Sequence, residues 1–199
     1  MKPPLHKTEG IIIRRFDVGE FDRILIVYTK EYGKISVQVK SLRKKEAKLR
    51  ETLELFNHVH LMLAYGKNID AVVGATIINS FPNLRTDLSS LAAVFYLSEL
   101  LDKLIVAPEK DEQIWDLVRK SFCFLDEKRR DTHVIKKLVE KFEDRLLVLL
   151  GHLPALQGEA LRAGPVDSVS DQRLSFIQNL YGQLIGSRGF LARELDRSQ

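Results

Sequence analysis

The chain has 199 residues, 45% of them hydrophobic and 29% charged, which excludes an intrinsically disordered polymer and allows one large or two small packed domains. Its single cysteine, Cys123, excludes an intramolecular disulfide and a zinc site built from cysteine pairs. No uncharged apolar run approaches the roughly 20 residues of a membrane-spanning helix, so we expect a soluble, cytoplasmic protein.

Positive charge is concentrated in the first third of the chain. The net charge is only +4, but residues 1–70 contain 14 Lys and Arg against 9 Asp and Glu, whereas residues 71–199 contain 17 against 18. Solubility alone does not require such clustering. The asymmetry indicates a polyanionic partner for the N-terminal part, because fixed positive charge attracts phosphates whatever their sequence.

Residues 8–80 show the alternation of apolar and polar side chains that is typical of half-buried strands. Turn signals separate five such segments, which contain Ile11 and Ile13; Ile24, Ile26 and Tyr28; Ile35, Val37 and Val39; Val59, Leu61 and Leu63; and residues 71–78. Residues 41–54, between the third and fourth segments, are rich in Lys, Glu, Leu and Ala and predict a short helix. This order predicts an OB-fold, a five-stranded barrel that commonly binds oligonucleotides.

After Phe81 and Pro82 the apolar spacing becomes helical, which predicts an α+β protein with a barrel domain, residues 1–80, and a helical domain, residues 81–199. Thr86 or Asp87 supplies the N-cap of a first helix, which reaches about Val106. This helix is apolar on two faces. One face carries Val94, Leu97, Leu101 and Leu104, and the other carries Leu88, Leu91 and Phe95. We therefore expect this helix to be central and largely buried.

Two further helices and a C-terminal region complete the helical domain. The helix after Pro108 is expected to bury Ile114, Val118, Phe122 and Leu125, and the helix from about Thr132 to bury Ile135, Leu138, Phe142, Leu146 and Leu149. Gly151 is expected to end that helix in a left-handed conformation. Residues 157–170 predict a loop, residues 174–184 a last helical region, and residues 190–195 a shorter turn.

Several motifs follow one another along the chain: TEGI from Thr8, then GE-x-DR, T-x-E-x-GK-I, FYLSELLDKL from Phe95, KFEDRLLVLLGHLPAL from Lys141, and SRGFL from Ser187. Together they resemble the RecO family of bacterial recombination mediators, over nearly the whole chain. The resemblance implies a DNA-repair accessory protein that binds single- and double-stranded DNA and promotes strand annealing. It further implies the loading of recombinase on DNA coated with the single-stranded-DNA-binding protein SSB, association with the nucleoid, and RecR as a second partner.

Two features depart from the family pattern. Many members carry cysteines just after the G-x-x-P element to form a zinc site, whereas Gln157 and Gly158 occupy this region here, so neither a metal site nor a cofactor is expected. The segment after Leu156 and the spacer at residues 127–131 look shorter than in the family. A pared-down C-terminal lobe is therefore expected.

The basic segment from Lys30 to Arg50 is the main candidate for DNA binding, with a surplus of six positive charges. We expect its cations to lie at the mouth of the barrel, extended by arginines of neighbouring strands, although a solvated loop is the simpler alternative. The candidate residues are Arg14, Arg15, Arg23, Lys34, Lys40, Arg43, Lys44, Lys45, Lys48 and Arg50. Four aromatic residues are candidates for base stacking, although at strand positions such rings more often belong to the core: Phe16, Phe21, Tyr28 and Tyr32.

In the third predicted helix, Lys137, Lys141 and Arg145 follow one another at intervals of four residues and form one cationic stripe. Such a stripe beside an apolar groove can receive an acidic peptide with an aromatic end, which describes the C-terminal tail of SSB, the partner that the resemblance implies. Surface ion pairing with the neighbouring Glu140, Glu143 and Asp144 is the simpler interpretation and the one that the sequence favours.

No pattern indicates catalysis. His58 and His60 share a strand face without an identifiable third metal ligand, and the S-x-x-K pattern at residues 41–44 lacks its companion motifs. Asp17, Glu20 and Asp22 crowd one turn, where they shape the turn and pair with Arg23 more simply than they hold a cation. Two non-enzymatic alternatives remain open: an RNA-binding module with the same barrel, and a protein-binding adaptor whose basic segment is incidental.

Overall fold

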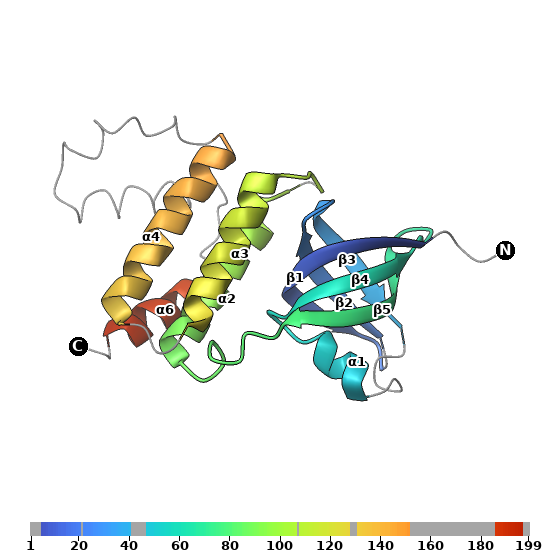
Figure 1. The fold of residues 1–199 in the computed structure, drawn as a ribbon, viewed down its shortest axis with the longest axis horizontal. Helices are drawn as coiled ribbons and strands as arrows, with labels where there is room; N and C mark the ends of the chain where they lie inside the picture. The colour runs from blue at the N-terminus through green and yellow to red at the C-terminus, as the bar shows by residue number, and fades with distance from the viewer. Residues whose placement is uncertain are drawn as a thin grey trace.

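The computed structural model describes residues 5–20, 22–40, 47–106, 108–127, 131–151 and 186–196. The β-structure lies at one side of the molecule and the long helices at the other (Figure 1). The elements are β1 (Leu5–Val18), β2 (Asp22–Thr29), β3 (Gly33–Val39), α1 (Ala47–Thr52), β4 (His58–Ala64), β5 (Asp70–Asn79), α2 (Leu88–Leu104), α3 (Glu112–Asp126), α4 (Thr132–Leu149) and α6 (Gly186–Asp196).

The five strands form a closed barrel in the order β1-β2-β3-β5-β4. All neighbours are antiparallel except β3 and β5, which close the barrel through a short parallel pairing of Val37 with Asp70 and Gln38 with Ala71. Helix α1 lies between β3 and β4 in the chain, and Leu53, which follows it, is buried in the barrel core. The structure therefore confirms the predicted five-stranded OB-fold with its inserted helix.

The first two strands differ from the sequence prediction, because their central residues are buried on both faces rather than on one. Ile12, Leu25 and Val27 point into the barrel core. Ile11, Ile13 and Tyr28 belong instead to a second core that they share with the helices. Ile11, Ile13 and Tyr28, which the alternating pattern identified in these two strands, thus lie on the outer face of the barrel, where the helical lobe covers them.

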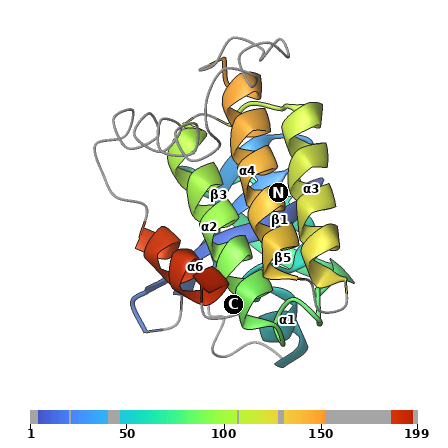
Figure 2. The ribbon, with the colours of Figure 1, turned by 90° about the vertical axis from the view of Figure 1, so that its left-hand side faces the viewer.

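The helical lobe is built around α2, with α3 and α4 beside it and α6 across it (Figure 2). As predicted, Asp87 is the N-cap of α2, its carboxylate accepting a hydrogen bond of 2.9 Å from the amide of Ser90. One predicted apolar face of α2 is buried, but Leu88 and Phe95 of the second face remain exposed. The lobe therefore covers α2 less completely than the sequence indicates.

Helices α3 and α4 bury the faces that the sequence predicts. Ile114, Val118, Phe122 and Leu125 of α3 are all buried. In α4, Ile135, Phe142 and Leu146 are buried, while Leu138 and Leu149 are partly buried. Gly151 follows α4 with a φ of 74°, the left-handed conformation expected of it.

Helix α6 is longer than the sequence prediction, which expected only a short turn at residues 190–195. Glu99 of α2 explains its position, because its carboxylate accepts hydrogen bonds from the amides of Gly186 and Ser187 and from the hydroxyl of Ser187, at 3.1, 2.8 and 2.5 Å. A carboxylate at a helix N-terminus satisfies amides that have no partner within the helix. The predicted loop at 157–170 and helix at 174–184 lie outside the described residues.

Two aromatic residues join the barrel to the helices. Phe56 and Phe81 both have positive φ, 70° and 49°, and both rings lie against Phe122 of α3, with centroids 6.2 and 5.8 Å away. Arg85 ties the same region together by donating hydrogen bonds to the backbone of Leu55 and to the side chain of Asn57. In the described part of the chain, no helix is both long and apolar enough to cross a membrane.

Candidate nucleic-acid interface

Four of the predicted DNA-binding cations contact carboxylates. Arg14 of β1 and Lys34 of β3 meet at Asp102 of α2, which lies 2.5 Å from Nη1 of Arg14 and 3.6 Å from Nζ of Lys34. The lysine also donates a hydrogen bond of 2.5 Å to the backbone oxygen of Asp102. Burial lowers the pKa of the Lys34 ammonium, and the neighbouring Asp102 opposes this only in part. This cluster joins the barrel to α2.

The other two paired cations lie toward the β1–β2 turn. Arg15 donates a hydrogen bond to Glu54, and Arg23 contacts both Asp17, at 2.7 Å, and Glu54, at 3.6 Å. The contact between Asp17 and Arg23 is the pairing that the sequence favoured over a cation site at this turn. All four of these cations therefore have part of their charge balanced within the protein.

The remaining predicted cations follow one another in the sequence from the end of β3 into helix α1. Lys40 and Arg50 are exposed and form no ion pair with any residue that the structure describes. Lys48 lies within α1, and Arg43, Lys44 and Lys45 lie outside the described residues. Lys40 and Arg50 are therefore cations whose charge remains available at this end of the barrel.

The aromatic candidates separate into buried and exposed rings. Tyr28 is only 1% exposed and stacks on Trp115 with ring centroids 6.5 Å apart, so of its two predicted roles the structure supports the core. The ring of Phe16 is exposed and carries the guanidinium of Arg14 at 4.4 Å. Tyr32 is exposed in the β2–β3 turn. Phe21 lies outside the described residues.

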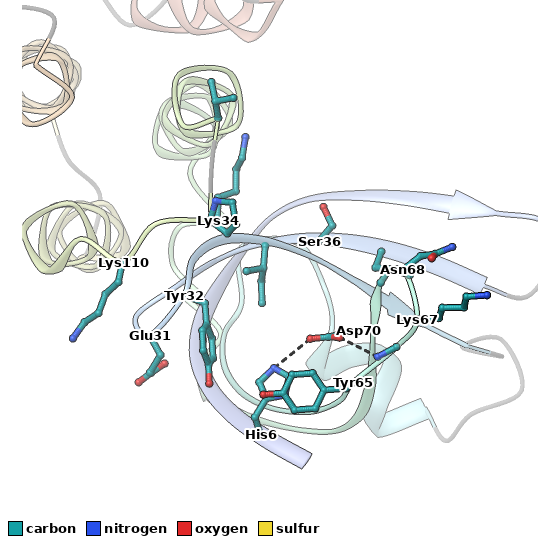
Figure 3. Close-up of a pocket in the computed structure, with 15 residues that line it drawn as sticks. His6, Glu31, Tyr32, Lys34, Ser36, Tyr65, Lys67, Asn68, Asp70 and Lys110 are labelled. Atoms are coloured by element: carbon teal, nitrogen blue, oxygen red, sulfur yellow. Dashed lines mark hydrogen bonds and ion pairs between the residues drawn. The ribbon is translucent and has the colours of Figure 1, made fainter. Parts of the chain in front are cut away.

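A pocket of about 880 Å³ opens where the β2–β3 turn, the β4–β5 loop and the loop between α2 and α3 meet (Figure 3). We call it the rim pocket. Rings and cations line much of it: His6, Tyr32, Lys34, Tyr65, Lys67 and Lys110. The sequence analysis identified only Tyr32 and Lys34 of this group. A turn signal separates the fourth and fifth strand segments at this point, and the use of the loop between these two strands by OB-folds is the signal that could have located the pocket.

The side chain of His6 organises the aromatic part of the rim pocket. Its ring stacks on Tyr65, with centroids 4.5 Å apart, and meets Tyr32 edge-on at 5.4 Å. Its Nε2 lies 3.4 Å from Asp70, whose other oxygen accepts a hydrogen bond of 3.0 Å from the amide of Gly66 (Figure 3). One histidine from β1 thus connects the two tyrosines to the β4–β5 loop.

His58 and His60 do not form a metal pair in the structure. His58 is buried at the junction with the helices, where its Nε2 lies 2.8 Å from Glu9 and its ring lies 5.6 Å from that of Trp115. Burial lowers the pKa of His58 despite the opposing charge of Glu9. His60 is exposed. The described residues contain no group of three or more potential metal ligands.

The cationic stripe of α4 lies on the exposed side of the helical lobe. Lys137, Lys141 and Arg145 are all exposed, and Arg145 donates a hydrogen bond of 2.9 Å to Gln113 of α3. Neither lysine forms an ion pair with a described residue. The three side chains therefore form a continuous cationic row along one helix, as the spacing predicts.

A closed five-stranded barrel of this topology packed on a helical lobe defines an OB-fold protein of the α+β class. The sequence model described as recombination protein O N terminal matches residues 1–81, and the model described as recombination protein O C terminal matches residues 85–175. The chain belongs to the RecO family.

Individual relatives agree with this assignment. A DNA repair protein RecO from Roseiflexus sp. (strain RS-1) is 32% identical over 175 residues, which are 88% of this chain and 60% of the relative. The DNA repair protein RecO from Dehalococcoides mccartyi (strain ATCC BAA-2266 / KCTC 15142 / 195) is 36% identical over 156 residues, 78% of this chain and 60% of the relative. That from Gloeothece citriformis (strain PCC 7424) is 28% identical over 196 residues, 98% of this chain and 67% of the relative. The chain thus spans about 60% of the length of the first two relatives.

Proposed function

We propose that this protein is a DNA-repair accessory factor that binds single- and double-stranded DNA through its barrel and promotes annealing of complementary strands without covalent chemistry. The observation that carries the proposal is an OB-fold of the RecO family with Lys40 and Arg50 exposed beside the basic segment 43–48. Cations that neutralise phosphates reduce the repulsion between two strands, which lowers the barrier to pairing.

The salt dependence of DNA affinity tests this mechanism. For about five phosphate contacts on a single strand, the slope of log affinity against log salt concentration is expected to be about −3.5. Charge reversal of Lys44, Lys45 and Lys48 is expected to flatten the slope by about two units. Charge reversal of Lys137 and Lys141, on the far lobe, is the matched control. An unchanged slope in the first variant removes those three lysines from the site.

The ion-paired cations have a secondary part in this proposal. Arg14, Arg15, Arg23 and Lys34 share their charge with carboxylates, so their contribution to the salt slope is expected to be smaller than that of Lys40, Arg43 and Arg50. Single Ala variants compare one cation from each group: Arg23, which is paired with carboxylates, and Lys40, which forms no ion pair with a described residue. Equal losses of affinity would contradict this ranking.

The partner RecR, loading of recombinase and binding of the SSB tail belong to the same proposal, and the exposed row on α4 supports the last of these. A peptide with an acidic, Phe-terminated tail is expected to bind the full chain, and charge reversal of Lys137, Lys141 and Arg145 is expected to abolish that binding. No binding by the folded wild type would dismiss this site.

Competition between single-stranded DNA and RNA separates the repair function from an RNA-binding module.

A further inference from the structure

We propose that the rim pocket receives one unpaired nucleobase, stacked on Tyr65 and Tyr32, and that this pocket gives the barrel a preference for single-stranded over double-stranded DNA. The inference rests on the proposed DNA-binding function and deepens it, since charge neutralisation alone does not distinguish the two forms of DNA. A pocket of about 880 Å³ lies within the range of natural small-ligand sites, which is ample for one nucleotide.

Tyr32 and Tyr65 are both exposed, and this exposure does not contribute to the stability of the fold. Tyr65 is 55% exposed and Tyr32 is 38% exposed, although both are large rings that burial would stabilise. Exposed aromatic side chains beside cations are the arrangement that single-strand binders use, because every base has a flat face that stacks without regard to sequence. Their chemistry therefore fits a nucleobase.

The rings are held in place before any ligand arrives. His6 contacts both tyrosines, and the β4–β5 loop that carries Tyr65 is fixed by the hydrogen bond from Gly66 to Asp70. A side chain at position 66 would overlap the backbone oxygen of Ile69, so the loop depends on glycine for this conformation. Rigid rings lose little entropy on binding, which strengthens the contact with a base.

The opposite wall comes from the loop between α2 and α3. The backbone of Glu109 lies directly against Gly33, where a Cβ atom would fall 2.1 Å from the carbonyl oxygen. Val106, Pro108 and Lys110 of this loop thereby face the barrel across the pocket. A base entering the pocket would therefore contact both the barrel and the helical lobe.

The charges of the pocket suit a phosphate at its edge. Lys67 forms no ion pair with a described residue, and Lys110 pairs only with the exposed Glu112, at 2.9 Å. The two carboxylates of the wall are already engaged: Glu31 accepts hydrogen bonds from the hydroxyl of Thr8 and the amide of Glu9, and Asp70 accepts one from Gly66. Lys34 and Lys110 are paired with Asp102 and Glu112, so Lys67 is the lining cation whose charge is available to a phosphate at the pocket edge.

Duplex DNA cannot use such a pocket without disruption, because each of its bases is paired and stacked on both faces. Extruding a base costs free energy that an unpaired strand does not spend. The rim pocket therefore adds affinity for single strands only, whereas the cations add affinity for both forms.

The test measures binding of the full chain to an oligothymidylate and to a hairpin duplex of equal phosphate count by fluorescence anisotropy. Tyr65→Ala is expected to weaken single-strand binding about tenfold and to leave duplex binding within about twofold. Tyr65→Phe keeps the ring and is expected to retain the affinity. Leu88→Ala, which removes an exposed apolar side chain of α2 outside the pocket and outside the candidate DNA-binding residues, is the matched control.

A direct readout follows from placing the fluorescent base 2-aminopurine in the oligonucleotide, since stacking quenches its emission. Wild type and Tyr65→Phe are expected to quench it, and Tyr65→Ala to lose the quenching. Equal losses for single strands and duplex, or no loss for either, would overturn the pocket proposal. Failure of the wild type to bind both polymers at low salt would instead overturn the proposed function, so the two failures are distinguishable.

Discussion

At the level of single residues, Gly33 and Gly19 have almost the same left-handed backbone but very different surroundings. Their φ angles are 65° and 61°. An added Cβ at Gly33 meets the backbone of Glu109, whereas one at Gly19 meets nothing within 4 Å. The difference separates the cost of the backbone conformation from the cost of close packing.

We therefore expect Gly33→Ala to reduce the free energy of unfolding much more than Gly19→Ala does. The left-handed conformation alone costs about 1–2 kcal/mol for a residue with a Cβ atom, and this is the whole effect expected at Gly19. At Gly33 the overlap with Glu109 adds to it, for a total of about 3 kcal/mol or more. Urea denaturation of both variants measures this, and equal losses would mean that the 106–110 loop moves aside without cost.

Asp102 is the residue that decides whether Arg14 and Lys34 are available to phosphates. Its side chain is 14% exposed and contacts both cations at once. Asp102→Asn is expected to destabilise the protein by about 2 kcal/mol, because it leaves the largely buried Lys34 without its carboxylate. It is also expected to strengthen single-strand binding and to steepen the salt slope by about 0.7 for each phosphate gained.

The matched control for that prediction is Asp116→Asn, which makes the same change in net charge on α3, where Asp116 pairs with Lys120. It is expected to change neither the slope nor the affinity. Stronger binding in both variants would show that only the total charge matters. Unchanged binding in Asp102→Asn would assign Arg14 and Lys34 a purely structural role.

Among the elements, α6 depends most clearly on one contact, the cap that Glu99 provides. Burial of the carboxyl would raise the pKa of Glu99, but hydrogen bonds from Ser187 and Gly186, together with the charge of Lys103, bring this pKa below its ordinary value. A carboxyl whose pKa is lower in the folded state stabilises the fold above its unfolded pKa, and the effect is lost as the pH falls through the folded value.

Glu99→Ala is accordingly expected to cost about 1 kcal/mol at pH 7, the usual effect of removing a helix cap, and to reduce hydrogen-exchange protection in residues 186–196 about fivefold. The difference between variant and wild type should shrink as the pH falls through the lowered pKa of Glu99, because the protonated carboxyl no longer provides a charged cap. A difference that persists unchanged at pH 3 would contradict the cap as its cause.

Elements were predictable from the sequence where local chemistry decides them, and less so where distant residues do. The Asp87 cap, the buried face of α3 and the turn at Gly151 each follow from a few neighbouring residues. The pairing of Arg14 with Asp102 joins residues 88 positions apart, and no local pattern encodes it. The rim pocket escaped prediction for the same reason, since three separate loops form it.

The whole molecule is organised around a core that barrel and helices share. Ile11, Ile13 and Tyr28 of the barrel are buried together with residues of α2, α3 and α4. A boundary near residue 80 therefore divides the chain by secondary structure, but a barrel without the helices would expose these three apolar side chains to water. Their burial favours one cooperative folding unit.

The single tryptophan makes this cooperativity measurable, because Trp115 lies on α3 against Tyr28 of the barrel. In urea, Trp115 fluorescence and far-UV circular dichroism are expected to report one coincident transition. Tyr28→Ala should lower the free energy of unfolding by about 3–4 kcal/mol and shift both signals together, since the cavity it leaves is shared by the two lobes. Tyr65→Ala, which removes an exposed ring from the same barrel, is expected to stay within about 0.5 kcal/mol of wild type. If Tyr28→Ala separates the two signals instead, the lobes fold independently, and the rim pocket between them would then open and close with their docking.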